Sequence, residues 1–258
     1  MTFPRTPAFI PRMADITLVP IDRLELRFAP KPWAFADERR AEIDDHFAAL
    51  RRERPKIWNG RVLVLHEFAV ADGVLRGAYL ETDFASFLAW RDWGFPDRSV
   101  RNCFAMGALS AADGAFVLGV MASHTANAGK VYFFGGTPDP DDVIEGRVDL
   151  EGSVLRELAE ETGLSPDLVR PEPGWHAIFE GGRIAMVKML RAAEPAAALR
   201  ERIVAFLARE PNPELAAVHV VRGPADLDPM MPAFVCKFFE HAWQERPGSL
   251  SPLGRGTG

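Results

Sequence analysis

The spacing of apolar residues from position 101 onward predicts strands that alternate with helices. Strands are expected where apolar residues alternate or run continuously, at residues 103–109, 115–121, 130–134, 177–190 and 216–221. Helices are expected where apolar residues recur at helical spacing, at residues 150–162, 196–209 and 232–243. This order of elements is typical of a mixed α/β sandwich.

The first hundred residues carry a pattern of their own. The predicted elements are a strand at residues 16–28, a helix at 35–54, a hairpin at 61–79 and a short helix at 83–93. The pair Asp72-Gly73 lies between the two halves of the hairpin, where such a pair favours a tight turn. This stretch therefore predicts an added α+β module.

The pattern divides the chain into three parts. We expect the α+β module at residues 1–100, an α/β domain at 101–245 and a mobile tail at 246–258. Three of the four tryptophans in the module are assigned to its core rather than to a stacking platform for a ligand: Trp58, Trp90 and Trp93.

Composition narrows the class of protein. The chain has 258 residues, of which 48% are hydrophobic, so it can bury a sizeable core. Its formal charge of −6 argues against a nucleic-acid partner, because such proteins usually carry a basic surface. No apolar run is long enough to span a bilayer or to form a signal peptide, and the two cysteines form no disulfide framework. We expect a cytoplasmic protein with no membrane partner.

The helix predicted at residues 150–162 carries an acidic face. Glu157, Glu160 and Glu161 fall within one sector of the helix, and apolar residues occupy the opposite side. One interpretation is a solvated acidic surface. The other is a site for a hard cation, since clustered carboxylates suit Mg²⁺ or Mn²⁺. The preceding Gly135-Gly136 turn favours the second interpretation, because glycine lets backbone and phosphate approach closely.

These residues also form a recognisable motif. The segment RELAEETGL, which begins at Arg156, resembles the second half of the Nudix box, and Tyr132 to Gly136 resembles the strand and double glycine that open it. The chain is similar to Nudix hydrolases over about residues 101–243. The resemblance implies an α/β/α sandwich with a mixed sheet. It also implies Mg²⁺- or Mn²⁺-dependent hydrolysis of a small molecule, a nucleoside diphosphate linked to another moiety.

The resemblance also implies roles for individual residues. Glu157, Glu160 and Glu161 would hold the metal together with Gly136, one of the three glutamates would act as base, and Arg156 would orient a carboxylate. Further metal-binding and substrate-binding candidates are Glu214, His124 and Gly135. Glu214 resembles an acid that some family members carry after the box, with Glu210 and Glu180 as competitors. For the glutamates and the histidine, the alternatives are ordinary solvated or structural side chains.

The sequence departs from the Nudix pattern in one loop. Arg156 follows Gly136 by 20 positions, six more than in the box, and Val148 stands where the pattern has glutamate. Glu145, Asp149 and Glu151 are nearby acids. We expect the loop to lie beside the metal site, with Glu145 or Asp149 replacing the missing carboxylate. The entropic cost of closing a loop grows only slowly with its length, so the six added residues can shape the pocket without destabilising the core. The rival interpretation is a solvated acidic loop.

The front module gives a hint about the substrate. The segments around Trp58-Asn59-Gly60, Thr82 and the run FLAWRD resemble the module that precedes the box in UDP-glucose/UDP-galactose diphosphatases. That resemblance implies a UDP-sugar substrate. The alternative is a Nudix-fold module that binds or senses a nucleotide sugar without turnover. The oligomeric state stays open, with a homodimer among the options.

Overall fold

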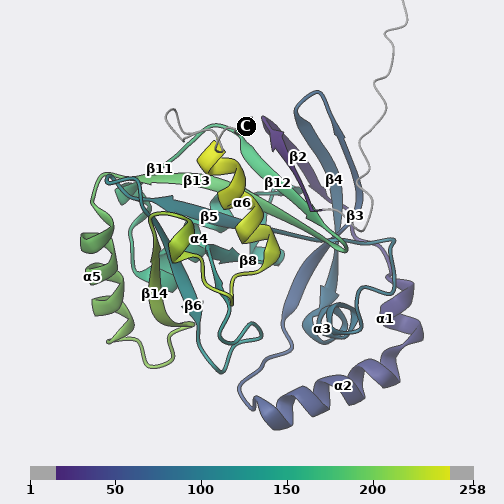
Figure 1. Cartoon of the computed structure of the whole chain (residues 1–258). Helices are drawn as coiled ribbons and strands as arrows, with labels where there is room; N and C mark the ends of the chain where they lie inside the picture. Colours follow the sequence, from purple (N-terminus) through teal and green to yellow (C-terminus); the bar gives the residue numbers. More distant parts are fainter. Residues whose placement is uncertain (1–15, 245–258) are drawn as a thin grey trace, which may run out of the picture.

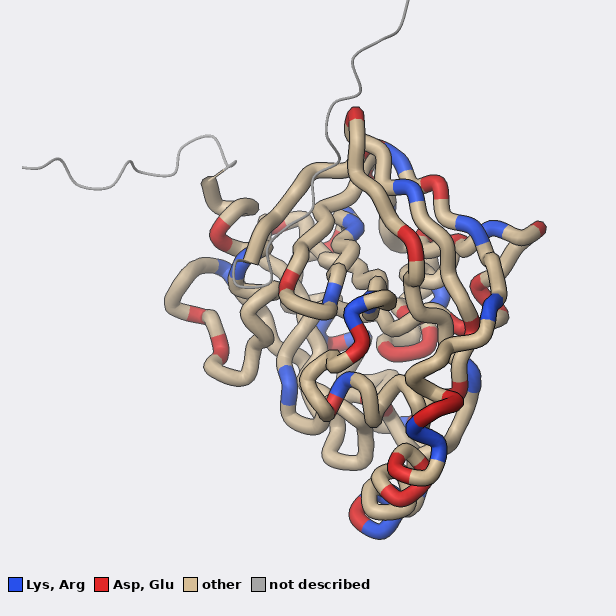
Figure 2. Tube along the Cα trace, turned by 90° about the vertical axis from the view of Figure 1, so that its right-hand side faces the viewer, with Lys and Arg blue, Asp and Glu red and all other residues tan. Residues whose placement is uncertain are grey.

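The computed structural model describes residues 16–244, which form two β-sheets and six α-helices (Figure 1). The predicted mixed α/β class is confirmed. The tail predicted at residues 246–258 lies outside the described residues. No helix within residues 16–244 combines the length and apolar character needed to cross a membrane. Acidic and basic residues are interspersed along the trace, as on the lowest helix in Figure 2.

The larger sheet is mixed, with the strand order β1-β12-β13-β5-β6-β14. Its path strands are β1 (Thr17–Ile21), β5 (Asn102–Ser110), β6 (Phe116–Met121), β12 (Trp175–Glu180), β13 (Arg183–Ala192) and β14 (Leu215–Val221). Three short strands pair beside this path: β7 (Val131–Tyr132), β8 (Phe134–Gly136) and β11 (Val169–Pro171). Strands β5 and β13 pair in parallel, and the other neighbours are antiparallel.

Helices cover both faces of this sheet. Helices α4 (Leu150–Thr162) and α5 (Ala196–Leu207) pack on one face, and α6 (Ala233–Gln244) packs on the other against β12 and β1. The alternation along β5 explains both layers, since Ala105 points into the core under α4 and Met106 into the core under α6. The apolar surface on each face of the sheet is thereby removed from water.

The smaller sheet has the order β3-β4-β2-β10-β9. Its strands are β2 (Arg23–Phe28), β3 (Arg61–Ala71), β4 (Val74–Asp83), β9 (Val143–Ile144) and β10 (Arg147–Val148). Helices α1 (Ala34–Glu38), α2 (Arg40–Glu53) and α3 (Phe84–Asp92) gather beside it at the lower right of Figure 1. Val64 and Leu80 pack under these helices, whereas Leu65 and Tyr79 face the core that the larger sheet shares.

The two sheets do not follow the boundary placed at residue 100. The strand predicted at residues 16–28 is broken after Ile21, so that β1 joins the larger sheet and β2 the smaller one. Strands β9 and β10, which lie in the predicted loop, also join the smaller sheet. The division into domains stays a prediction, but the sheets are interleaved across it.

The tryptophans of the module have different environments. Trp90 is fully buried and makes a T-shaped contact with Trp33, with ring centroids 5.6 Å apart. Trp58 is 81% exposed, so its assignment to the core is wrong. It lies between Pro55 and Gly60 in the connection before β3, where no apolar layer covers it.

Candidate active site

A cleft of about 640 Å³ lies where the two parts of the molecule meet. Helix α3 contributes Phe84, Phe87 and Arg91 to its wall. The opposite side is formed by α4, by the turn at Gly135-Gly136 and by the connections on either side of the larger sheet. Charged groups that line the cleft are Arg91, Lys130, Arg183, Glu157, Glu161, Glu180 and Glu214. The cleft therefore combines carboxylates with cationic and aromatic side chains.

The glycine turn holds one carboxylate directly. The backbone N–H of Gly135 donates a hydrogen bond to Oε2 of Glu161 at 3.1 Å. Gly135 has a φ of +145°, and a Cβ there would overlap the carbonyl oxygen of Ala105, so only glycine fits. A Cβ on Gly136 would lie 3.5 Å from the carboxyl carbon of Glu157. The chain backbone therefore runs directly beside both carboxylates.

Burial and mutual repulsion perturb both acids. Burial raises the pKa of Glu157 to about 7, with the charge of Arg156 opposing and the charges of Glu160 and Glu214 adding. Burial also holds the pKa of Glu161 well above its ordinary value, and the negative charge of Glu157 adds to this effect. Such clustered carboxylates lack sufficient positive charge around them, which is typical of a functional site.

Arg156 is held by acids from two segments. Its Nη2 donates to Oδ1 of Asp142 at 3.0 Å, and its Nη1 lies 3.2 Å from carboxylate oxygens of both Glu157 and Glu160. Asp142 is buried, and its Oδ2 accepts from the hydroxyl of Ser153 at 3.0 Å. This network fixes the guanidinium beside Glu157, the position expected of a residue that orients a carboxylate.

The structure sorts the predicted acids into two groups. Glu157, Glu161 and Glu214 line the cleft, and the charge of Glu214 acts on both of the others. Glu160 is 59% exposed, pairs with Arg156 and does not line the cleft. Of the competitors considered for Glu214, Glu180 lines the cleft and Glu210 does not.

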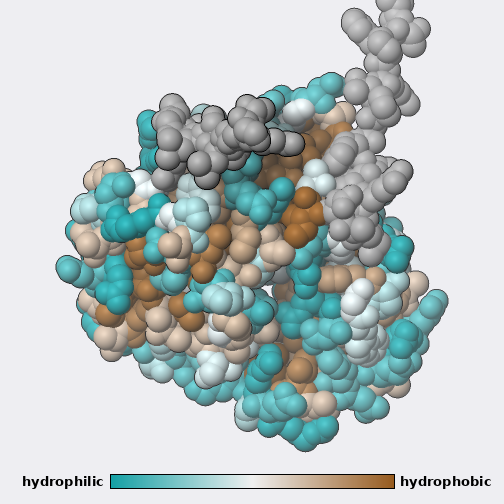
Figure 3. Space-filling model, viewed as in Figure 1, coloured by the Kyte–Doolittle hydropathy of each residue, from teal (hydrophilic) through white to brown (hydrophobic). Residues whose placement is uncertain are grey.

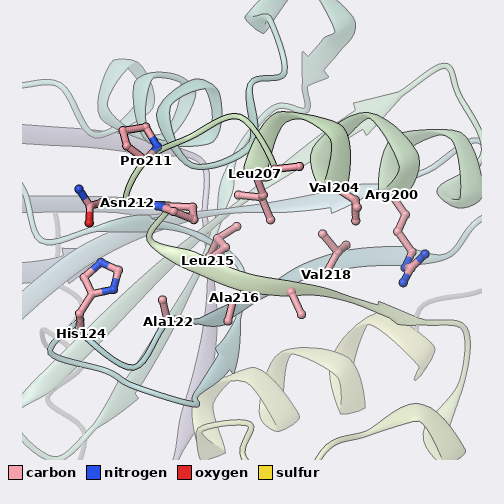
Figure 4. A pocket seen from close by; sticks show the side chains of 13 residues that line it. Ala122, His124, Arg200, Val204, Leu207, Pro211, Asn212, Leu215, Ala216 and Val218 are labelled. Carbon is pink, nitrogen blue, oxygen red and sulfur yellow. The ribbon is translucent and has the colours of Figure 1, made fainter.

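The residues expected to contact a phosphate both border the cleft. Gly135 lies beside the carboxylates, and His124 lies in the connection after β6. His124 also borders a second hollow between α5 and β14, shown in Figure 4. Exposed apolar atoms over these two elements are visible on the left of Figure 3. The residues that line this hollow within the described chain include no carboxylate, so it lacks the chemistry of the cleft.

The long loop is folded, and neither Glu145 nor Asp149 lines the cleft. Asp149 caps α4, accepting from the backbone N–H of Gly152 at 3.0 Å, and Glu145 lies exposed in the β9–β10 turn with a φ of +49°. Val148 is buried in the core. The acid that reaches Arg156 is Asp142, which the sequence interpretation missed.

A local signal for Asp142 exists in the sequence. Asp139 and Asp142 form a reciprocal cap around a 3₁₀ turn that begins at Pro140. An acid followed by proline and a second acid at this spacing favours such a turn. The turn directs the Asp142 side chain inward, toward Ser153 and Arg156.

The donor chemistry of the cleft fits Mg²⁺ or Mn²⁺. Within residues 16–244, no three His, Cys, Asp or Glu side chains already converge as a metal-holding group. Glu157, Glu161 and Glu214 nevertheless offer hard oxygen donors around one cleft, and the raised pKa values of the first two mark a deficit of positive charge. A divalent cation with oxygen ligands would relieve that deficit.

Comparisons with known proteins give similarity at the level of the fold only. No protein-family model matches the chain, and no curated protein sequence matches it. The chain resembles the structure of a Nudix hydrolase from M. smegmatis, RenU, at 19% identity over 57% of this chain and 88% of that one, with a TM-score of 0.37. It also resembles a MutT protein from Methanosarcina mazei Go1, at 18% identity over 56% and 94%, with a TM-score of 0.36. Similarity of this size does not identify a reaction.

Proposed function

We propose that the protein is a metal-dependent Nudix-type hydrolase that cleaves the diphosphate linkage of a nucleoside diphosphate derivative. One observation carries the proposal. Glu157 and Glu161, which belong to the RELAEETGL segment, meet the Gly135-Gly136 turn in a cleft large enough for a nucleotide. UDP-sugars are the first substrates to test, because of the front-module resemblance. The ligand is a small molecule rather than a nucleic acid or a membrane.

The residues of the cleft have distinct tasks in this proposal. Glu157, Glu161 and Glu214 would hold Mg²⁺ or Mn²⁺, with the backbone of Gly136 beside them. When bound, the metal supplies polarisation of the phosphoryl oxygens and acidification of a water molecule. Gly135 orients Glu161 through its N–H, and Arg156 orients Glu157. One of the glutamates would accept a proton from the attacking water.

The remaining candidates act at the edge of this site. His124 would contact a phosphate from the connection after β6. Glu160 keeps its predicted metal role only if its carboxylate leaves Arg156, since the two are paired here. The alternative is a sensor without turnover, because Val148 stands where the Nudix box has a glutamate. The glutamates of the RELAEETGL segment that line the cleft, Glu157 and Glu161, favour the hydrolase.

The test is Mg²⁺-dependent release of nucleoside monophosphate from a panel of UDP-sugars and other nucleoside diphosphate derivatives. Wild type should release it, and removal of the metal by a chelator should stop the release. Glu161→Gln should lose about 100-fold or more in rate, because its carboxylate is removed at constant size. Glu145→Gln is the matched control, since Glu145 is exposed in a turn. Tight binding of a nucleotide sugar with no release under any metal would instead identify a sensor.

A further inference from the structure

Two arginines from different parts of the chain line the same cleft. Arg91 lies in the last turn of α3, and Arg183 is the first residue of β13, directly after the Gly181-Gly182 turn. Burial lowers the pKa of Arg183, the charge of Glu180 opposes this effect, and the charge of Arg91 adds to it. Two like charges held together in a partly buried cleft are unfavourable unless an anion joins them.

The guanidinium of Arg183 is partly exposed and has no hydrogen bond or ion pair with a side chain among the described residues, although Glu180 exerts a favourable charge effect. Its Cζ lies 4.8 Å from the centroid of the Phe95 ring. A guanidinium carries five N–H donors, so a partly buried one without acceptors is prepared for an external anion.

Phe95 holds Arg183 at the cost of backbone strain. Phe95 has a φ of +62°, an uncommon conformation for a bulky residue. Its ring packs on Trp90 with centroids 4.7 Å apart, and it fills the space that a Cβ on Gly182 would need. Strained residues persist where the surroundings over-determine them, and they cluster at ligand sites. Phe95 thus connects the core of the front module to the arginine of the cleft.

The side chain of Arg91 is fixed by Asp92. Its Nε donates to Oδ1 of Asp92 at 2.9 Å, and Oδ2 of Asp92 lies 3.0 Å from Nε2 of His46. This contact uses one donor of the guanidinium and orients the other four. The Arg91 side chain is only 17% exposed, so its free donors lie within the cleft rather than in open solvent.

We propose that Arg91 and Arg183 jointly bind the phosphate oxygens of the diphosphate ligand, so that the segment before residue 101 supplies half of the anion-binding site. The identity of the ligand rests on the proposed function. Arginine suits this task because its planar fork matches phosphate geometry. The two arginines also offset the repulsion between an anionic ligand and the carboxylates of Glu157 and Glu161 on the same cleft.

The experiment measures binding rather than turnover. UDP and ADP are titrated calorimetrically, with Mg²⁺ present, into wild type, Arg91→Gln, Arg183→Gln and the double variant. Each single change should weaken binding by about tenfold to a hundredfold, the effect of losing a charge-assisted hydrogen bond. The double variant should lose less than the product of the two, because both groups bind the same phosphates. Arg183→Lys, which keeps the charge, should retain part of the affinity even if Arg183→Gln folds poorly.

Arg170→Gln is the matched control, because Arg170 is exposed on β11 and lies outside the cleft lining. Affinities of Arg91→Gln and Arg183→Gln within about twofold of wild type would overturn the inference, as would wild type that binds neither UDP nor ADP. Hydrolysis that is unchanged in both variants rejects the inference and leaves the hydrolase standing. Binding that depends on the two arginines but is followed by no hydrolysis supports the inference and rejects the hydrolase.

Discussion

Helices α3 and α4 contribute to the same cleft but bury opposite kinds of side chain. Helix α3 buries Phe87, Leu88 and Trp90, and Asp83 caps it by accepting from the backbone N–H of Ser86 at 3.0 Å. Helix α4 buries Leu158 toward the sheet and also buries Glu161 beside the glycine turn. The first helix follows the ordinary rule that apolar groups leave water, and the second breaks it.

This difference separates stability from chemistry. Burial of an aromatic side chain stabilises a fold, whereas burial of an acid beside another acid destabilises it until a cation binds. Proteins tolerate such local conflicts mainly where function requires them. Changes in α3 should therefore act on the free energy of unfolding, and changes around α4 on turnover.

The largest expected effect is a loss of stability on changing a buried residue of α3. Trp90→Ala should lower the free energy of unfolding by about 3–5 kcal/mol, because it removes a fully buried ring from the aromatic cluster. Trp58→Ala, at an exposed site in the same module, should change it by less than about 0.5 kcal/mol. Urea denaturation of both variants makes the comparison, and equal losses would contradict the burial difference.

The next largest expected effect is a loss of activity on changing the acid that pairs with Arg156 of α4. Asp142→Asn should lower kcat/KM about 10- to 100-fold, because the charge that orients Arg156 is lost while the shape is kept. Glu145→Gln should leave both kcat/KM and the Mg²⁺ requirement unchanged. The opposite pattern, with only Glu145→Gln raising the Mg²⁺ requirement, would support the prediction that Glu145 replaces the missing loop carboxylate.

Asp83, which caps α3, should make the free energy of unfolding depend on pH. Burial opposes ionisation of Asp83, but hydrogen bonds from Arg40 and Ser86 outweigh it and lower its pKa to about 2, from 3.8 in model compounds. A lowered folded-state pKa stabilises the protein above the unfolded pKa, by about 2 kcal/mol here, and this stabilisation is lost as pH falls toward 2.

Asp83→Asn tests this link. The difference in unfolding free energy between wild type and variant should be greatest at neutral pH and should shrink steadily between about pH 5 and pH 2. Asp44→Asn is the control, since Asp44 is exposed on α2 and meets Arg40 only at 3.4 Å. A pH-independent difference would show that the charge of Asp83 contributes nothing.

The smallest expected effect is a gain in stability, opposite in sign to the loss expected for Trp90→Ala. Glu161→Gln should raise the free energy of unfolding by about 1 kcal/mol in the presence of a chelator, because the buried charge next to Glu157 is removed. Glu210→Gln, outside the cleft, should change it little. Thermal unfolding with and without Mg²⁺ measures both, and a loss of stability in Glu161→Gln without metal would contradict the comparison with α3.

Local patterns predicted most of the regular elements. The helix expected at residues 150–162 is α4 as observed, because its apolar spacing, its cap and the terminal Gly163 at a φ of +69° are all local. The acidic face was equally visible. Prediction failed where a short segment changes partner. Residues 16–28 serve two sheets, β10 pairs with β2 across more than a hundred residues, and β9 pairs with β10.

The sequence by itself determined the chemistry on α4, since three glutamates at helical spacing and a double glycine can be recognised without a fold. Only the tertiary structure decided which acids share the cleft, that Asp142 pairs with Arg156, and that Arg91 and Arg183 line the same cleft. The physical reason is the distance along the chain over which each effect acts. Helical periodicity and capping act over a few residues, whereas burial, charge repulsion and ligand geometry depend on groups that the chain brings together from distant positions.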